Sequence, residues 1–213
     1  MATYDLDEQE RLDELKAWWK RWGSVAMLAL AVVVAAAAGW RYWQTRTLTQ
    51  NLEAAAVYQK LTQSLAGNDA KGAREAGAML IDQYKDTAYA PRAALLLAKL
   101  NAIGKDLKSA QTQLEWAAAH SKEPAVKDLA RLRLAGVQLD QKQYDAALKT
   151  LDGAHSDAFA FRFHDLKGDV LLAQGKQADA RAAYQTAFGK MSEDNPYRSI
   201  VELKLDALGG QAK

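Results

Sequence analysis

The sequence predicts an all-α protein in which one N-terminal transmembrane helix is followed by a solenoid of helical hairpins. Three observations support this fold class. Residues 22–40 contain no charged side chain. The rest of the chain is rich in Ala, Leu, Gln, Lys and Glu and holds only three Pro, a composition that favours helices over strands. Small residues recur there every 33–37 residues, which indicates repeated hairpins.

The charge-free stretch 22–40 is the predicted transmembrane helix. As a helix it would be about 28 Å long, close to the hydrocarbon thickness of about 30 Å. Indole rings prefer the two membrane interfaces, and five of the six Trp lie at its ends: Trp18, Trp19, Trp22, Trp40 and Trp43. The alternatives are a buried core helix and a signal peptide cleaved near 35–38. The long preceding region, which carries both signs of charge, opposes cleavage.

Lys and Arg are more frequent before this stretch than directly after it. Four of them lie within residues 1–21, whereas Arg41 and Arg46 follow the stretch. By the positive-inside rule, the N-terminus is predicted to be cytoplasmic. In a bacterium, the chain from residue 41 onward would then be periplasmic, and the absence of Cys is compatible with that oxidising compartment. We therefore expect a single-pass type II protein of the bacterial inner membrane, in contact with membrane lipid.

Four segments are predicted: a tail (1–21), the transmembrane helix (22–40), a linker (41–50) and a helical domain (51–213). The tail has six acidic against four basic residues, and its Leu and Trp recur near helical spacing. This pattern predicts an amphipathic helix along the inner membrane surface. The tail is either a solvated lead-in or a cytoplasmic contact for a regulator or for loops of a membrane partner.

A stripe of small residues runs along the predicted span. Ala31, Ala35 and Gly39 follow one another at intervals of four, so they share one helix face. Small residues let another transmembrane helix approach closely. The stripe is a candidate packing face, although Ala is frequent enough in this segment for chance to produce the spacing.

The domain from residue 51 onward is expected to be entirely helical. Gly-rich and Pro-containing segments separate its helical stretches. The expected helices are 51–65, 71–84, 90–102, 106–120, 125–140, 144–153, 159–174, 177–190 and 196–208.

The clearest repeat lies in residues 164–188 and matches the tetratricopeptide pattern. Gly168 and Ala180 occupy the small positions of its two helices, Gly175 lies in the turn, and Tyr184 and Ala187 face the next repeat. One repeat earlier, the same roles fall on Ala135, Lys142, Ala147, Leu151 and Ala154. A further repeat back, they fall on Ala98, Lys105, Ala110, Leu114 and Ala117, with a weak fourth copy at Ala73.

These positions have a physical role in hairpin packing. Small residues lie where two helices cross at close range, and larger apolar residues are buried between hairpins because one hairpin cannot bury them alone. The expected architecture is a short right-handed solenoid with a concave face. The alternative is an irregular helical bundle in which the Ala spacing is coincidental.

Several segments together resemble a known family. They are the acidic tail with its Trp-rich span, then residues 89–99, 129–135 and 165–175. In this order they are similar to the YfgM family, the ancillary SecYEG translocon subunits, over nearly the whole chain. The resemblance implies a periplasmic repeat domain beside the SecYEG channel that works with the membrane-anchored chaperone PpiD on newly exported proteins. It also implies a link to a cytoplasmic response regulator, which would fall on the tail.

The sequence offers no catalytic constellation. It contains His120, His155 and His164 but no H-E-x-x-H, and neither a G-x-S-x-G nor a P-loop is present. Asp157 and Asp165 lie close in sequence to two of these His, yet no helical i, i+4 pair joins the two His into a metal site. Charges after residue 41 are interspersed, so no basic stripe for nucleic acid is expected. We expect a non-enzymatic protein without cofactor or metal.

Three of the four Phe are clustered at Phe159, Phe161 and Phe163. On a helix, Phe159 and Phe163 share a face and Phe161 points away from it, so at least one ring is expected to be poorly buried. Either all three rings pack between hairpins, or Phe161 contacts a partner or an unfolded segment.

The repeat register also predicts the concave face. Its residues would be Arg162, Asp165, Asp169 and Leu172, with Leu129, Leu132, Gly136 and Leu139 one repeat earlier. The partner-binding candidates are therefore Phe161, Arg162, Asp165, Asp169, Leu172, Leu132 and Leu139. The expected function is an ancillary translocon subunit that binds protein partners through this domain and assists the chaperoning of exported proteins. The alternative is a membrane-anchored scaffold or assembly factor for another envelope complex.

Overall fold

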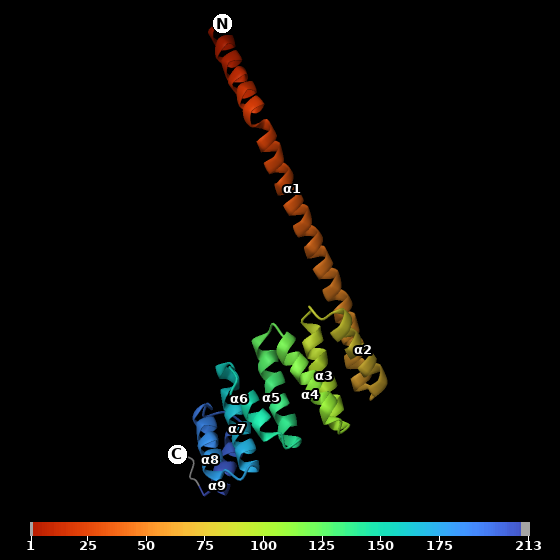
Figure 1. Cartoon of the computed structure of the whole chain (residues 1–213), viewed down its shortest axis with the longest axis vertical. Coiled ribbons are helices and arrows are strands. Elements are labelled where there is room, and N and C mark those ends of the chain that lie inside the picture. The colour runs from red at the N-terminus through yellow and green to blue at the C-terminus, as the bar shows by residue number, and fades with distance from the viewer. Residues whose placement is uncertain (1, 210–213) are drawn as a thin grey trace. The chain divides into compact units, whose positions relative to one another are not determined.

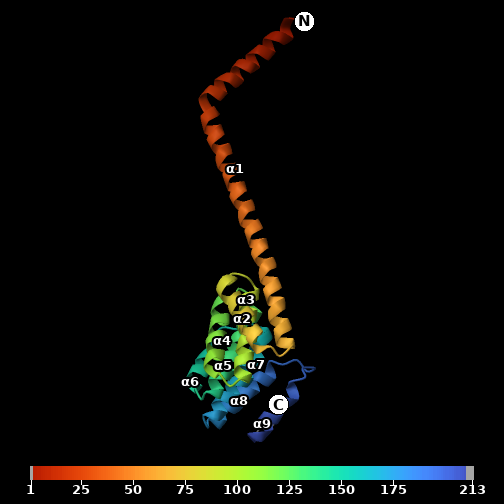
Figure 2. The same cartoon turned by 90° about the vertical axis from the view of Figure 1, so that its right-hand side faces the viewer.

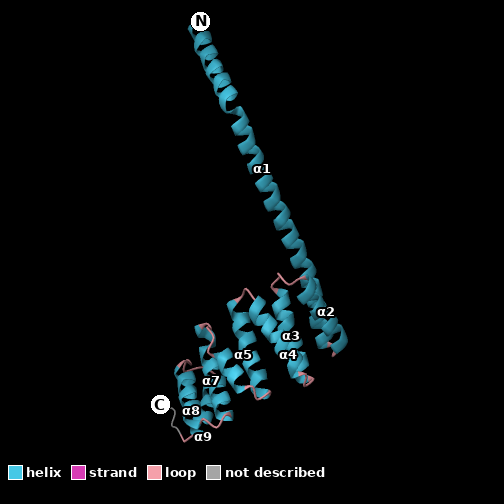
Figure 3. Cartoon of the chain, viewed as in Figure 1, coloured by secondary structure: helices cyan, strands magenta, loops and turns pink. Residues whose placement is uncertain are grey.

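The computed structural model describes the backbone of residues 2–209 and the side chains from residue 11 to residue 209. Within this range the ordered elements are helices, and no strand is present (Figure 3). The chain divides into two compact units, residues 1–50 and 51–213. The helices are α1 (Ala2–Ala66), α2 (Ala70–Gln83), α3 (Tyr89–Ile103), α4 (Leu107–His120), α5 (Pro124–Asp140), α6 (Tyr144–Leu151), α7 (Asp157–Ala173), α8 (Gln177–Gly189) and α9 (Arg198–Ala207).

The all-α prediction is confirmed, and the eight expected helices after residue 70 begin and end within two residues of their expected bounds. The first expected helix, 51–65, is instead the end of α1, which begins at Ala2. The linker 41–50 is itself helical, because α1 runs through it without a break. This segment contains neither Gly nor Pro. The hydroxyls of Thr45, Thr47 and Thr49 donate to the carbonyls four residues earlier, which keeps these β-branched residues compatible with the helix.

The first unit consists of the N-terminal part of α1. Its apolar side chains between residues 22 and 40 are exposed, apart from the partly exposed Ala26, and the flanking Trp rings are about half exposed. Trp18 and Trp19 lie 6.3 Å apart between ring centroids, and Trp40 and Trp43 lie 5.8 Å apart. Figure 2 shows a bend in the red-to-orange part of α1, the region that contains the pair Gly23–Ser24, and Gly/Ser pairs are common sites of helix kinks.

The second unit is built from stacked hairpins, which follow one another in order along the domain (Figure 1). Each hairpin packs on the next, and the first helices of successive hairpins, α3, α5 and α7, also contact one another. Four apolar clusters bridge these elements. The first joins the end of α1 to α2 and α3, and the last joins α7 and α8 to α9. Each cluster depends on a neighbouring hairpin, as in other helical repeats.

The small residues of the predicted period lie where the hairpins close. The four copies in the second helices are fully buried, at 0% exposure: Ala73, Ala110, Ala147 and Ala180. In the first helices, Ala98, Ala135 and Gly168 are also buried. A Cβ on Gly168 would lie 2.4 Å from the ring of the fully buried Tyr184. The tetratricopeptide-like prediction is therefore confirmed.

The turns within the hairpins repeat the same backbone conformation. Asn68, Lys105, Lys142 and Gly175 have φ values of 55°, 61°, 59° and 79°. After each of them, the next N–H donates to the carbonyl five residues earlier, as in the Schellman motif that closes a helix C-terminus. Only Gly adopts this conformation without steric cost. The repeat is therefore visible in the backbone conformation of the turns as well as in the spacing of the Ala residues.

One expected packing position is wrong. The repeat register predicts that Ala154 is buried like Ala187 and Ala117, but Ala154 is exposed whereas the other two are buried. The cause is the short α6, which ends at Leu151 and is followed by Asp152 and Gly153. Ala154 therefore lies in the connection to α7 instead of on a helix face.

Candidate protein-interaction surfaces

The C-terminal helix α9 covers part of the α7 surface that the repeat register assigns to the concave face. Val201 and Leu205 of α9 are buried and pack in one cluster with Tyr184, Phe188 and Leu171. Helix α9 thus contributes the apolar surface that a further hairpin would otherwise supply. The i, i+4 spacing of Val201 and Leu205 was the sequence signal that could have revealed this role.

An ion-pair network holds α9 to α7. Lys204 Nζ lies 2.8 Å from Asp165 Oδ1 and 2.7 Å from Asp169 Oδ1. The hydroxyl of Tyr184 donates to Asp169 Oδ1 at 2.7 Å. The side chains of Lys204, Asp165 and Asp169 are 25–33% exposed. The structure therefore places two predicted partner-binding carboxylates in contacts within the domain.

Burial and the neighbouring charges shift the pKa values of three groups in this network. It raises the pKa of Asp165 above the usual value, although the hydrogen bond and charge of Lys204 act in the opposite direction. Burial alone would lower the pKa of Lys204, but the hydrogen bonds and charges of Asp165 and Asp169 outweigh it, so this pKa is raised. Burial and then the hydrogen bond to Asp169 raise the pKa of Tyr184. The amine therefore stays charged and the phenol neutral at neutral pH.

All three clustered Phe rings have packing partners within the domain. Phe163 is buried, and Phe159 packs with it in the cluster of α5, α6 and α7. Phe161 is partly buried against the α8–α9 cluster, with its ring centroid 6.3 Å from that of Tyr197. Phe159 and Phe161 are thus only partly buried, and the segment before α9, with Tyr197, lies against the side of α7 that carries Phe161.

The remaining candidates differ in accessibility. The guanidinium carbon of Arg162 lies 4.9 Å from the Tyr197 ring centroid and 5.6 Å from that of Phe161, a cation–π arrangement. Leu132 and Leu139 are partly buried against the α5–α7 cluster. Leu172, at 40% exposure, is the most accessible apolar candidate. Binding of a partner by any of these residues stays a prediction.

Among residues 11–209, no group of three or more His, Asp or Glu is arranged to hold a metal ion. The rings of His155 and His164 lie 6.2 Å apart, edge to face, and His155 also lies 4.5 Å from the Phe163 ring. Burial, followed by the charges of His155 and Lys167, lowers the pKa of His164. His155 Nδ1 also lies 3.2 Å from the carbonyl oxygen of Ser156, so the described contacts of His155 are aromatic packing and one hydrogen bond to the backbone.

The apolar part of α1 forms a second candidate surface. It is long and apolar enough to cross a membrane, and almost none of it is buried within the protein. A helix with apolar side chains on all sides requires a nonpolar environment. Ala31, Ala35 and Gly39 are exposed on it, and a Cβ on Gly39 would meet no other atom within 4 Å. The stripe is therefore open to another transmembrane helix.

The similarity to known proteins includes the apolar part of α1 as well as the repeat domain. Residues 16–210 match the family described as Tetratricopeptide repeat-like domain. A Neisseria gonorrhoeae protein named "Ancillary SecYEG translocon subunit" is 32% identical over 98% of this chain and 100% of its own length. Proteins of the same name from Haemophilus influenzae and Escherichia coli are each 30% identical, over 97% and 98% of this chain and 100% and 99% of their own lengths.

Proposed function

Because the chain belongs to the tetratricopeptide repeat-like family of ancillary SecYEG translocon subunits, we propose that it is itself a non-enzymatic ancillary subunit of SecYEG. Residues 22–40 anchor it in the bacterial inner membrane as a single span. The repeat domain binds protein partners and assists the chaperoning of exported proteins. The observation that carries this proposal is the similarity over nearly the whole chain, which includes the Trp-bracketed span as well as the repeats.

The proposed topology has a cytoplasmic tail (1–21) and a periplasmic domain (51–213). The excess of Lys and Arg before the span supports this orientation. Reporter fusions at residues 15 and 60 test it, and a cytoplasmic signal from residue 60 would contradict it. In this orientation the tail is available to a cytoplasmic response regulator, and the domain to a PpiD-like periplasmic chaperone and to client proteins.

The stripe of Ala31, Ala35 and Gly39 is the proposed contact with a transmembrane helix of SecYEG. Leu side chains on this face would hold the two helices apart, because close approach needs small residues. A double substitution, Ala31→Leu with Ala35→Leu, therefore tests the contact. Ala26→Leu with Ala37→Leu is the matched control, because it adds the same side chains to the opposite face of the helix.

The experiment is affinity purification of the full chain from cells in mild detergent, with SecYEG quantified in the eluate. The stripe variant should recover about tenfold less SecYEG than wild type, and the control variant should equal wild type. Equal recovery with both variants would refute the helix contact. Recovery of a different envelope complex by wild type, without SecYEG, would instead indicate a scaffold for that complex.

A further inference from the structure

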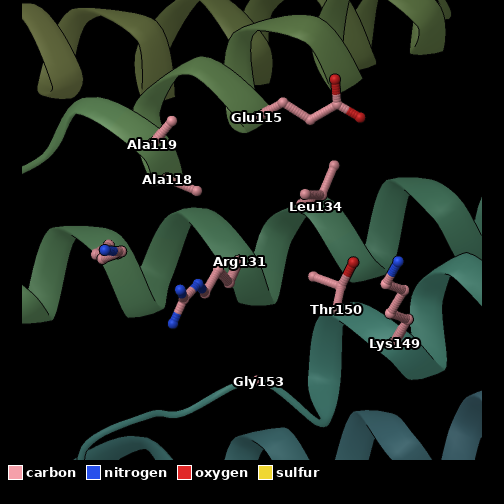
Figure 4. Close-up of a pocket in the computed structure, with 9 residues that line it drawn as sticks. Glu115, Ala118, Ala119, Arg131, Leu134, Lys149, Thr150 and Gly153 are labelled. Carbon is pink, nitrogen blue, oxygen red and sulfur yellow. The ribbon is translucent and has the colours of Figure 1, made fainter.

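A groove with basic side chains crosses the middle of the repeat domain, between α4 and α6 and over α5. It consists of two adjacent open hollows of about 440 Å³ and about 490 Å³, which share Lys127 and Arg131. Figure 4 shows the first hollow, with Arg131 and Leu134 of α5 between the end of α4 and Lys149 of α6. We call these two hollows the basic groove. None of the seven partner-binding candidates on α5 and α7 lines it.

Four cations line the basic groove, namely Lys122, Lys127, Arg131 and Lys149. Among the described side chains, none of these four forms an ion pair with a carboxylate. Arg131 donates one N–H to the carbonyl of Ala154 at 2.5 Å, which fixes its guanidinium at the centre of the groove and leaves other N–H groups for a ligand.

Two carboxylates line the groove, Asp128 and Glu115, and both accept hydrogen bonds within the domain. Asp128 is buried and accepts hydrogen bonds from the N–H and hydroxyl of Ser156, at 2.9 and 2.7 Å. Glu123 pairs with Arg92 at 2.7 Å, and Asp152 pairs with Lys167 at 2.6 Å. Glu115 lies at the rim, where Gln111 donates to it. The groove therefore has a local excess of positive charge in a domain whose charges are otherwise interspersed.

The floor of the groove is apolar. Ala118 and Leu134 line the first hollow, and Pro124 and Ala154 line the second. Along α5, the distance from residue 124 to residue 134 is about 15 Å, which corresponds to four or five residues of an extended chain. A cationic rim above an apolar floor of this length suits a peptide that carries both carboxylates and apolar side chains. A phosphate headgroup would use the rim and leave the floor uncovered.

We propose that the basic groove binds an acidic, extended segment of a partner protein, with carboxylates on Lys127, Arg131 and Lys149 and small apolar side chains over Leu134. Charge complementarity sets the specificity for this segment, and the apolar floor adds contact area. The site is separate from the α7–α9 surface, where Asp165 and Asp169 already meet Lys204. It is also independent of any contact that the membrane span makes.

The test uses the full chain in nanodiscs of phosphatidylcholine, whose zwitterionic headgroups add no net charge. The probe is a fluorescent peptide in which Asp and Glu alternate with Leu and Ala, and its partner probe carries Asn and Gln in place of the acids. Fluorescence anisotropy measures binding. The acidic peptide should bind, the neutral peptide should bind at least about tenfold more weakly, and added salt should weaken the acidic complex.

The diagnostic variant is Lys127→Gln with Lys149→Gln, which removes two groove charges that no carboxylate pairs. The matched control, Lys99→Gln with Lys190→Gln, removes two exposed and equally unpaired charges outside the groove. The groove variant should bind the acidic peptide about tenfold more weakly, and the control should bind like wild type, with equal melting temperatures for all three. Equal weakening by both variants would overturn the proposal. So would groove-dependent cosedimentation with phosphatidylglycerol vesicles without peptide binding, which would assign the groove to a lipid surface.

Discussion

The same small side chains have opposite surroundings in the two units of this protein. Ala31, Ala35 and Gly39 of the span are exposed along the helix, whereas Ala147 and Ala180 of the repeat domain are fully buried. In the repeats, a small residue fixes how closely two helices of the same chain approach. In the span, the same property is available to a transmembrane helix of another chain. Small residues therefore specify internal packing in one unit and external packing in the other.

The largest expected difference between the units comes from adding volume at these positions. Ala180→Leu should lower the free energy of unfolding of the repeat domain by about 3 kcal/mol, because the larger side chain forces two packed helices apart. The measurement is denaturant unfolding of the full chain, followed by the circular dichroism of the domain. Ala35→Leu is the control and should leave this transition unchanged. A similar loss in both variants would contradict the contrast between the units.

Gly168 and Gly136 test the same idea within the repeats. Gly168→Ala should cost about 2 kcal/mol, because its Cβ would meet the ring of the buried Tyr184. Gly136→Ala should instead stabilise by up to about 1 kcal/mol, since its Cβ meets no atom and Ala favours the helix. Thermal or denaturant unfolding measures both. If both substitutions changed the free energy of unfolding in the same direction, the close approach of α7 and α8 at Gly168 would not be the reason for Gly at this position.

The charged network on α9 has no counterpart in the charge-free span. Lys204→Met should lower the free energy of unfolding by about 1.5 kcal/mol, because it leaves Asp165 and Asp169 next to each other without their cation, at a site partly screened by solvent. Lys190→Met, which removes an exposed and unpaired cation, should change it little. An unchanged stability of the Lys204 variant would mean that apolar packing alone holds α9.

The pH dependence of the same network has a defined sign. The pKa of Lys204 is raised above 10.5 in the folded state, so its contribution to stability is complete below pH 10.5 and is lost as the pH rises through the higher folded value. The stability difference between wild type and Lys204→Met should therefore be constant from neutral pH to pH 10.5 and shrink above it. Denaturant unfolding from neutral to alkaline pH measures the difference, and a decrease that is complete before pH 10.5 is reached would contradict this assignment.

The smallest effect concerns the turns, which interrupt the repeats but not α1. Lys105→Gly should stabilise the domain by somewhat less than about 1 kcal/mol, because Gly adopts its φ of 61° without steric cost. Lys99→Gly, in the middle of α3, should destabilise it by about 1 kcal/mol. A gain in stability for Lys105→Gly and a loss for Lys99→Gly would confirm that the left-handed backbone conformation at Lys105 costs the folded domain free energy.

Local sequence spacing was sufficient to predict the helices, the repeat period and the apolar span. The small residues at 110, 147 and 180 and the turn residues at 105, 142 and 175 each depend on contacts within one hairpin, so their spacing is visible in the sequence. The interaction of Lys204 with Asp165 and Asp169 joins residues 39 and 35 positions apart, and no local pattern indicates it. The basic groove likewise combines side chains from three helices and their connections.

The proposal that the span contacts SecYEG is tested most directly by photo-crosslinking in cells. A photoreactive residue placed at position 35, on the small-residue stripe, should crosslink to a SecYEG subunit. The same residue at position 37, on the opposite face, should not. Crosslinks to SecYEG from position 37 but not from 35 would contradict the proposed packing face. The absence of SecYEG from both positions, with crosslinks to another envelope protein, would contradict the assignment of the chain to the translocon.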